Sequence, residues 1–161
     1  TPYDKKLALL NDKLNRTYVP YGAKGHSRQR NQVRQDANAG QMSAAASASR
    51  AVTKASSAYR AAEWDLVDAV KGGVSLESIE EEQLPEAMQE MSREARTDYV
   101  TTQSKARAAV QQQIQQLGNE RREYILDERA KAGRKSDEGL SAALKDGLRK
   151  AAQAKGFVFN N

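Results

Sequence analysis

Small apolar residues recur at heptad spacing over residues 42–70. Steps of three and four alternate without a break along a seam formed by Ala45, Ala48, Val52, Ala55, Tyr59, Ala62, Leu66 and Ala69. Such a repeat is typical of a helix that packs along a partner helix, and small seam residues allow close approach. The pattern predicts one long helix over residues 42–70, with Gly72 and Gly73 as its stop.

A second long helix is predicted over residues 92–132. Its apolar stripe consists of Tyr99, Ala106, Val110, Ile114, Leu117, Tyr124 and Ile125. Ser92 can cap its first turn, and Gly133 is expected to close it. Gly118 is an interior glycine, which costs a helix about 1 kcal/mol and is tolerable where packing supports it.

Three shorter helices are predicted over residues 4–18, 26–39 and 136–155. The first carries the apolar stripe Leu7, Leu10 and Leu14, and the last carries the stripe Leu140, Leu144 and Leu148. Gly40 is expected to end or kink the helix over residues 26–39. The apolar tail at residues 157–159 is expected to fold back onto the bundle.

An acidic connector at about residues 72–91 joins the two long helices. Within it, Leu84, Pro85 and Glu86 predict a fresh helical start, because proline suits the first helical position. A connector of this length makes an antiparallel hairpin the simplest topology. We therefore predict an all-α fold, an elongated antiparallel helical hairpin or bundle of coiled-coil type with shorter flanking helices, as a single domain over residues 1–161.

The composition favours thin helices over a thick globular core. Leu, Ile, Val and Phe make up 26 of the 161 residues, below the level of about 20% at which disorder becomes a serious interpretation. The near balance of 26 basic and 21 acidic residues argues against disorder. No apolar run approaches the roughly 18 residues of a membrane span, so no membrane insertion is expected. The chain starts at Thr1 without a methionine, and we interpret it as a fragment of a longer protein.

The net charge of +5 hides a segregation along the chain. Residues 1–62 carry 11 basic and 3 acidic residues, residues 63–98 carry 3 and 11, and residues 99–161 carry 12 and 7. The acidic connector could neutralise the basic first third within the fold, or belong to a surface that meets another protein.

A basic nucleic-acid-associated protein is the alternative function that this charge suggests. Arg28, Arg30 and Arg34 form a basic stretch, but the nearest aromatics, Tyr18 and Tyr21, lie outside it in a Pro/Gly loop. We therefore consider nucleic acid an unlikely partner. Binding to random duplex that falls steeply with salt would support the alternative.

The chain is predicted not to be an enzyme. With one histidine and no cysteine, neither a thiol nucleophile nor a multi-His metal site can form within it. His26 is expected to face solvent. Asp65 with Asp68, and Glu77 with Glu80 or Glu81, have spacings that can bind divalent cations or do acid/base work. Because such pairs are common on helix surfaces, we assign no catalytic residue, no metal ligand and no cofactor.

Two groups of residues are candidates for binding a protein partner. One consists of the aromatic residues Tyr18, Tyr21 and Trp64, for which packing within the bundle is the simpler alternative. The other consists of the acidic residues Glu80, Glu81 and Glu82. Self-association, with the Ala45–Ala69 seam pairing between chains, is a further possibility.

Several segments, taken in order, resemble one known group of proteins. They are LLNDKLN (residues 9–15), TYVPYG (17–22), QDANA (35–39), WDLVD (64–68), LPEAM (84–88) and AKGF (154–157). This set resembles the C-terminal region of bacterial proteins that carry a von Willebrand factor A (VWA) domain upstream. The Asp-x-Ser-x-Ser pattern of the metal site in that domain does not occur here, so no metal ligand is carried over.

The resemblance implies a helical module attached to a VWA domain in an exported protein of the periplasm or cell envelope. Together with the residue patterns, it leads us to expect a non-enzymatic protein-interaction or spacer module. Its partner would be another protein or its own upstream VWA domain.

Overall fold

The computed structural model describes the backbone of residues 1–154 and the side chains within residues 1–133 and 139–150. Over this range the fold is all-α, as predicted, and no strand is formed there. The single domain predicted over residues 1–161 corresponds to two compact units, Thr1–Arg121 and Arg122–Asn161. The predicted tail at residues 157–159 lies outside the described residues.

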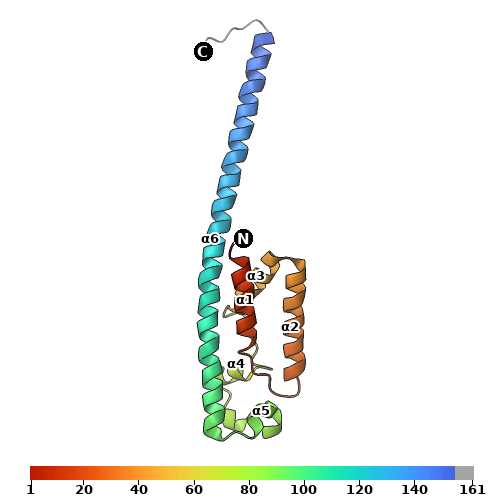
Figure 1. Cartoon of the computed structure of the whole chain (residues 1–161), viewed down its shortest axis with the longest axis vertical. Helices are drawn as coiled ribbons and strands as arrows, with labels where there is room; N and C mark the ends of the chain where they lie inside the picture. The colour runs from red at the N-terminus through yellow and green to blue at the C-terminus, as the bar shows by residue number, and fades with distance from the viewer. Residues whose placement is uncertain (155–161) are drawn as a thin grey trace. The chain divides into compact units, whose positions relative to one another are not determined.

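The first unit contains six α-helical segments and two short 3₁₀ turns within the described range (Figure 1). They are α1 (Asp4–Asn15), α2 (Gly25–Met42), α3 (Ala44–Lys54), α4 (Leu66–Lys71), η1 (Leu76–Ser78), η2 (Glu81–Gln83), α5 (Glu86–Gln89) and the first part of α6 (Arg93–Ala154). In the second unit, the described residues belong to the continuation of α6.

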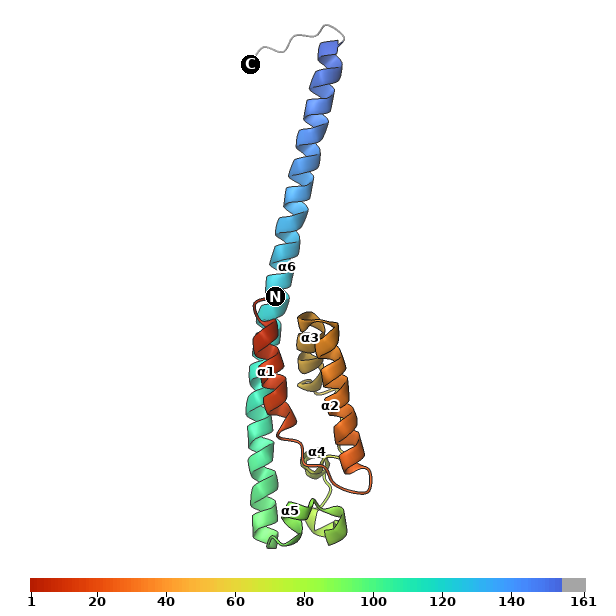
Figure 2. The ribbon, with the colours of Figure 1, turned by 45° about the vertical axis from the view of Figure 1, so that its right-hand side comes forward.

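The three leucines predicted to share one face of α1 form the centre of the main core. Leu7, Leu10 and Leu14 are buried against the alanines of α3 and against Ile114 and Leu117 of α6. Both views show α1 alongside the first part of α6, and α3 packs against α1 and α2 (Figures 1 and 2). The spacing of three and four residues thus identified the buried face of α1 correctly.

The single helix predicted over residues 42–70 is wrong. Helix α3 ends at Lys54, residues 55–65 are irregular, and α4 begins only at Leu66. Serine contributes to this end, because the Ser56 hydroxyl donates to the Thr53 carbonyl oxygen at 2.7 Å and competes with the helical backbone bonds. The break also allows Trp64 to enter the core. Only α6 is long, so the predicted hairpin lacks one of its two arms among the described residues.

Two glycines expected to end helices lie within them instead. Helix α2 continues through Gly40 to Met42, and Ser43 then caps α3 with a hydrogen bond from the Ala46 N–H. Helix α6 continues through Gly133 to Ala154, so residues 136–154 of the separate helix predicted over residues 136–155 are its last part. A single interior glycine costs about 1 kcal/mol, which strong helix formers on both sides can offset.

The acidic connector contains η1, η2 and α5, and it joins α4 to α6 rather than two long helices. Helix α5 begins at Glu86, within the predicted fresh start. Leu84 and Met88 anchor the connector in a second core cluster with Val19, Leu66 and Val100. A backbone hydrogen bond of 2.8 Å from the Gly22 N–H to the Gln83 carbonyl oxygen also holds it. Gly22 has a φ of +69°, a conformation that favours glycine.

Gly118 lies where α6 passes close to α3. A Cβ atom built at this position would be 2.9 Å from Val52 Cγ2, and Val52 is stiff at χ1 because it is β-branched. We therefore expect Gly118→Ala to destabilise the fold, by about 1 kcal/mol, even though alanine is the better helix former. In a Val52→Ala background, the same substitution should become stabilising. Urea unfolding followed by circular dichroism measures both effects.

Gly40 supplies the matched control for this prediction. It also lies within a helix, but a Cβ atom there would meet nothing within 4 Å. Gly40→Ala should raise the free energy of unfolding by about 0.5–1 kcal/mol in either background. Equal stabilisation by both glycine substitutions in the wild-type background would contradict the close contact.

Candidate functional site

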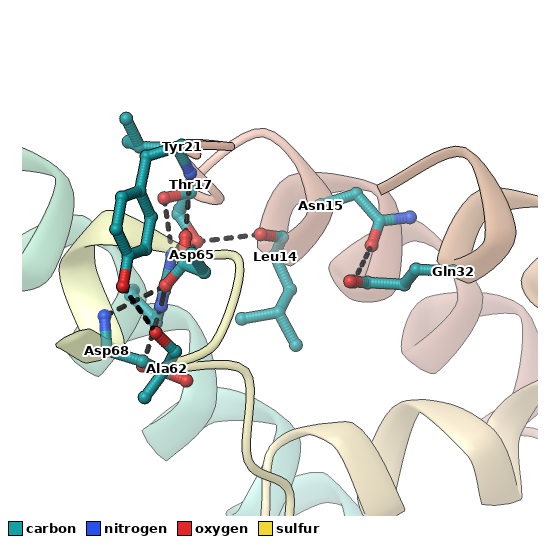
Figure 3. A network of polar contacts seen from close by, with 10 residues as sticks. Leu14, Asn15, Thr17, Tyr21, Gln32, Ala62, Asp65 and Asp68 are labelled. Atoms are coloured by element: carbon teal, nitrogen blue, oxygen red, sulfur yellow. Dashed lines mark hydrogen bonds and ion pairs between the residues drawn. The ribbon is translucent and has the colours of Figure 1, made fainter. Parts of the chain in front are cut away.

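Asp65 lies in the first of two buried groups of polar side chains, or polar centres, in the first unit. Its carboxylate caps α4 by accepting a hydrogen bond from the Asp68 N–H at 2.9 Å. It also accepts one from the Val19 N–H at 2.7 Å, and its side chain has no exposed surface. One carboxylate thus joins the loop after α1 to the start of α4 (Figure 3).

Arg107 of α6 completes this centre. Its guanidinium donates to Asp65 at 2.5 and 3.0 Å and to Asp68 at 2.7 Å. It also donates to the Thr17 carbonyl oxygen at 2.6 Å and lies 4.3 Å from the centroid of the Tyr18 ring. A bidentate, fully hydrogen-bonded guanidinium is the arrangement in which a buried ion pair can offset lost hydration. We call Asp65, Asp68 and Arg107 the Arg107 centre.

The expectation that Asp65 and Asp68 form an ordinary helix-surface pair is wrong, because Asp65 is fully buried. Both carboxylates face the Arg107 guanidinium, which supplies the positive charge that a cation would otherwise bring. Glu77 and Glu80 are exposed. Over the residues that the structure describes, no three His, Asp or Glu side chains are grouped so that they could hold a metal ion.

Lys54, the last residue of α3, lies in a second buried polar centre. Its ammonium donates to Asp36 at 2.7 Å and to the Asn15 amide oxygen at 2.5 Å. Asp36 also accepts from Asn11, Asn15 and Arg50. Burial alone would raise the pKa of Asp36, but these donors hold it below its ordinary value. We call Asp36, Lys54 and Arg50 the Asp36 centre; it joins α1, α2 and α3.

The predicted aromatic candidates lie largely within the packing of the first unit. Tyr18 and Trp64 are stacked with ring centroids 5.3 Å apart, and only 6% and 7% of their surfaces are exposed. Tyr21 is partly buried, and its hydroxyl donates to the Ala62 carbonyl oxygen at 2.8 Å (Figure 3). Tyr18 and Trp64 are thus packed within the first unit, which was the simpler of the two alternatives. Partner binding by these residues stays a prediction.

The acidic candidates lie on the surface. Glu80, Glu81 and Glu82 are all exposed, and Glu81 forms an ion pair with Arg96 of α6 at 3.3 Å. Buried Lys54 and partly buried Arg50, both from the basic first third, pair instead with Asp36 from the same part of the chain. His26 is exposed, as expected.

A cleft of about 460 Å³ opens beside the two buried centres. Its walls come from residues 54–62, from the end of α4 and from α6, and include Tyr59, Arg60 and Lys71. The Gln115 side chain donates to the Ala55 carbonyl oxygen at 2.9 Å and so attaches the irregular segment to α6. The heptad pattern did not predict this cleft. A continuous helix over residues 42–70 would lack the irregular segment that forms one of its walls.

No protein-family model, curated protein or solved structure matches this chain. The resemblance to the C-terminal region of VWA-domain proteins therefore stays a prediction. None of the described helices combines the length and the apolar character needed to cross a membrane.

The second unit contains an exposed leucine stripe on α6. Leu140, Leu144 and Leu148 are spaced four residues apart, so they lie on one helix face, and 58–69% of their surfaces are exposed. Ala143 and Gly147 line the same shallow surface. We call these five residues the leucine stripe. Three large apolar side chains on one face of a helix are typical of a helix that packs on another.

Proposed function

We propose that this chain is a non-enzymatic helical module through which a larger, exported VWA-domain protein of bacteria binds another protein. The observation that carries the proposal is the leucine stripe, in which Leu140, Leu144 and Leu148 share one face and remain mostly exposed. Removing apolar surface from water provides about 25 cal/mol per Å², so such a stripe favours association. The VWA context and the location in the periplasm or cell envelope rest on the resemblance described above.

The occupant that best fits the leucine stripe is an amphipathic helix of the partner. Leucines at every fourth position fit between the side chains of a facing helix, and the small residues Ala143 and Gly147 allow the two backbones to approach. In this proposal, coiled-coil packing occurs between α6 and a helix of the partner, and not between two long helices of this chain. The exposed residues Glu80, Glu81 and Glu82 would add long-range attraction toward a basic partner.

Capture of a partner from envelope extract tests this proposal. A variant with Leu140, Leu144 and Leu148 replaced by glutamine keeps good helix formers while removing the apolar face. We expect it to lose the captured protein. The Leu9→Gln variant is the control, because Leu9 is a similarly exposed leucine of the first unit, 56% exposed. It should capture as the wild type does.

Equal capture by the wild type and the triple variant would exclude the leucine stripe as the docking surface. Sedimentation over a concentration series then addresses self-association. A wild-type dimer that the triple variant converts to a monomer would show that the stripe's partner is a second copy of this chain, contrary to the proposal.

A further inference from the structure

Two basic side chains that line the cleft beside the two buried centres form no ion pair with any acidic side chain that the structure describes. Four charged side chains line it, namely Lys54, Arg60, Asp68 and Lys71. Lys54 is paired with Asp36, and Asp68 is paired with Arg107. Arg60 and Lys71 are exposed, and neither forms an ion pair within the part of the chain that the structure describes. The cleft therefore has an excess of positive charge at its surface.

We propose that this cleft binds a small organic phosphate ester. A phosphate monoester carries a charge of about −1.5 to −2 near neutral pH, which matches the two cations of Arg60 and Lys71 better than a single carboxylate does. The planar guanidinium of arginine can donate two parallel hydrogen bonds to phosphate oxygens, and lysine supplies a compact point charge. Ser57 and Gln111 also line the cleft and carry neutral donors.

The size of the cleft favours an organic ligand over a bare ion. Its volume of about 460 Å³ lies in the range of about 300–1,000 Å³ typical of small-molecule sites. Tyr59 provides a partly buried aromatic ring, and Ala61 and Ala62 provide apolar surface nearby. An aromatic or apolar body attached to the phosphate could therefore pack against Tyr59 while the phosphate contacts the cations.

Contacts within the chain hold three of the residues that line the cleft, Lys54, Ala55 and Asp68. The Asp36 centre holds Lys54 at one end of the irregular segment, and the Arg107 centre holds Asp68 of α4. The hydrogen bond from Gln115 to the Ala55 carbonyl oxygen attaches the segment to α6. Preorganisation of this kind lowers the entropy that binding would otherwise lose.

Isothermal titration calorimetry of the full chain with phenyl phosphate tests the proposal. Phenyl phosphate combines the dianion with an aromatic ring, whereas phenol lacks the charge and inorganic phosphate lacks the ring. We expect saturable 1:1 binding of phenyl phosphate, weaker binding of inorganic phosphate and no binding of phenol. Absence of saturable binding, or equal binding of phenyl phosphate and inorganic phosphate, would overturn the assignment of an organic phosphate.

Paired variants locate the binding to this cleft. Arg60→Gln with Lys71→Gln should weaken phenyl phosphate binding at least about tenfold, because each removes a hydrogen bond to a charged group. Lys5→Gln with Arg28→Gln changes the net charge equally at exposed positions outside the cleft, and it should leave the affinity within about twofold. Equal weakening by the two pairs would show that net charge, and not the cleft, is responsible. Because these residues belong to the first unit, the outcome is independent of the leucine stripe.

Discussion

Replacing Arg107 by methionine is expected to lower the free energy of unfolding by about 3–5 kcal/mol, because it leaves the buried Asp65 carboxylate without its cation. Asp65 would keep only its hydrogen bonds from the Val19 and Asp68 N–H groups. The Thr17 carbonyl oxygen would also lose its donor. Urea unfolding followed by circular dichroism measures the loss.

Arg93→Met is the matched control for this prediction, because it removes an arginine from the same helix. Arg93 and its partner Glu77 are both largely exposed, and their closest approach is 3.9 Å. Exposed pairs of this kind contribute about 0–1 kcal/mol, so the control should change stability little. Arg107→Lys should remain destabilising, because a lysine cannot form the bidentate contact. Losses of similar size at positions 93 and 107 would contradict the role given to the Arg107 centre.

Replacing Asp36 by asparagine is expected to lower the free energy of unfolding by about 3 kcal/mol at neutral pH. The substitution keeps the shape of the side chain but leaves the Lys54 ammonium, which has no exposed surface, without a negative partner. Arg50 loses the same partner. Asp98→Asn is the control, because Asp98 is an exposed aspartate of the same unit, and it should change stability by less than about 0.5 kcal/mol.

The pH dependence of stability distinguishes the loss of the Asp36 charge from a packing defect as the cause of the destabilisation. The pKa of Asp36 is lower in the folded chain than in the unfolded chain, where it is about 4. Its contribution is therefore present above about pH 4 and is lost as the pH falls through the folded-state pKa. The difference between wild type and Asp36→Asn should shrink as the pH falls below 4. A difference that stays constant down to pH 2 would indicate a packing defect.

The parts of the fold that followed from the sequence are those determined by local periodicity. Leu7, Leu10 and Leu14 face the core because their spacing matches one face of a helix. Around Ala55 the same kind of argument failed. A heptad pattern there continued across residues that tertiary contacts hold in an irregular conformation, and burial of Trp64 outweighed helix propensity.

The candidate site depended on contacts that no local pattern marks. No sequence pattern singled out Arg107, because its partners Asp65 and Thr17 lie 42 and 90 residues away. Two clues were present in the sequence near Asp65. It directly precedes an apolar segment, where an aspartate can cap a helix, and it follows the only tryptophan of the chain. The cleft itself could not be predicted, because it exists only where α3 ends early.

The long separation in sequence between Arg107 and its partners affects when the first unit can fold during synthesis. During synthesis, Thr17 and Asp65 leave the ribosome well before residue 107 does, at rates of about 5–20 residues per second. Until then Asp65 cannot acquire its guanidinium partner, and burying the lone carboxylate would be costly. The α4 region of a nascent chain therefore has to stay hydrated until Arg107 has left the ribosome. Release of a truncated chain before residue 107 should yield a product that does not complete the first unit.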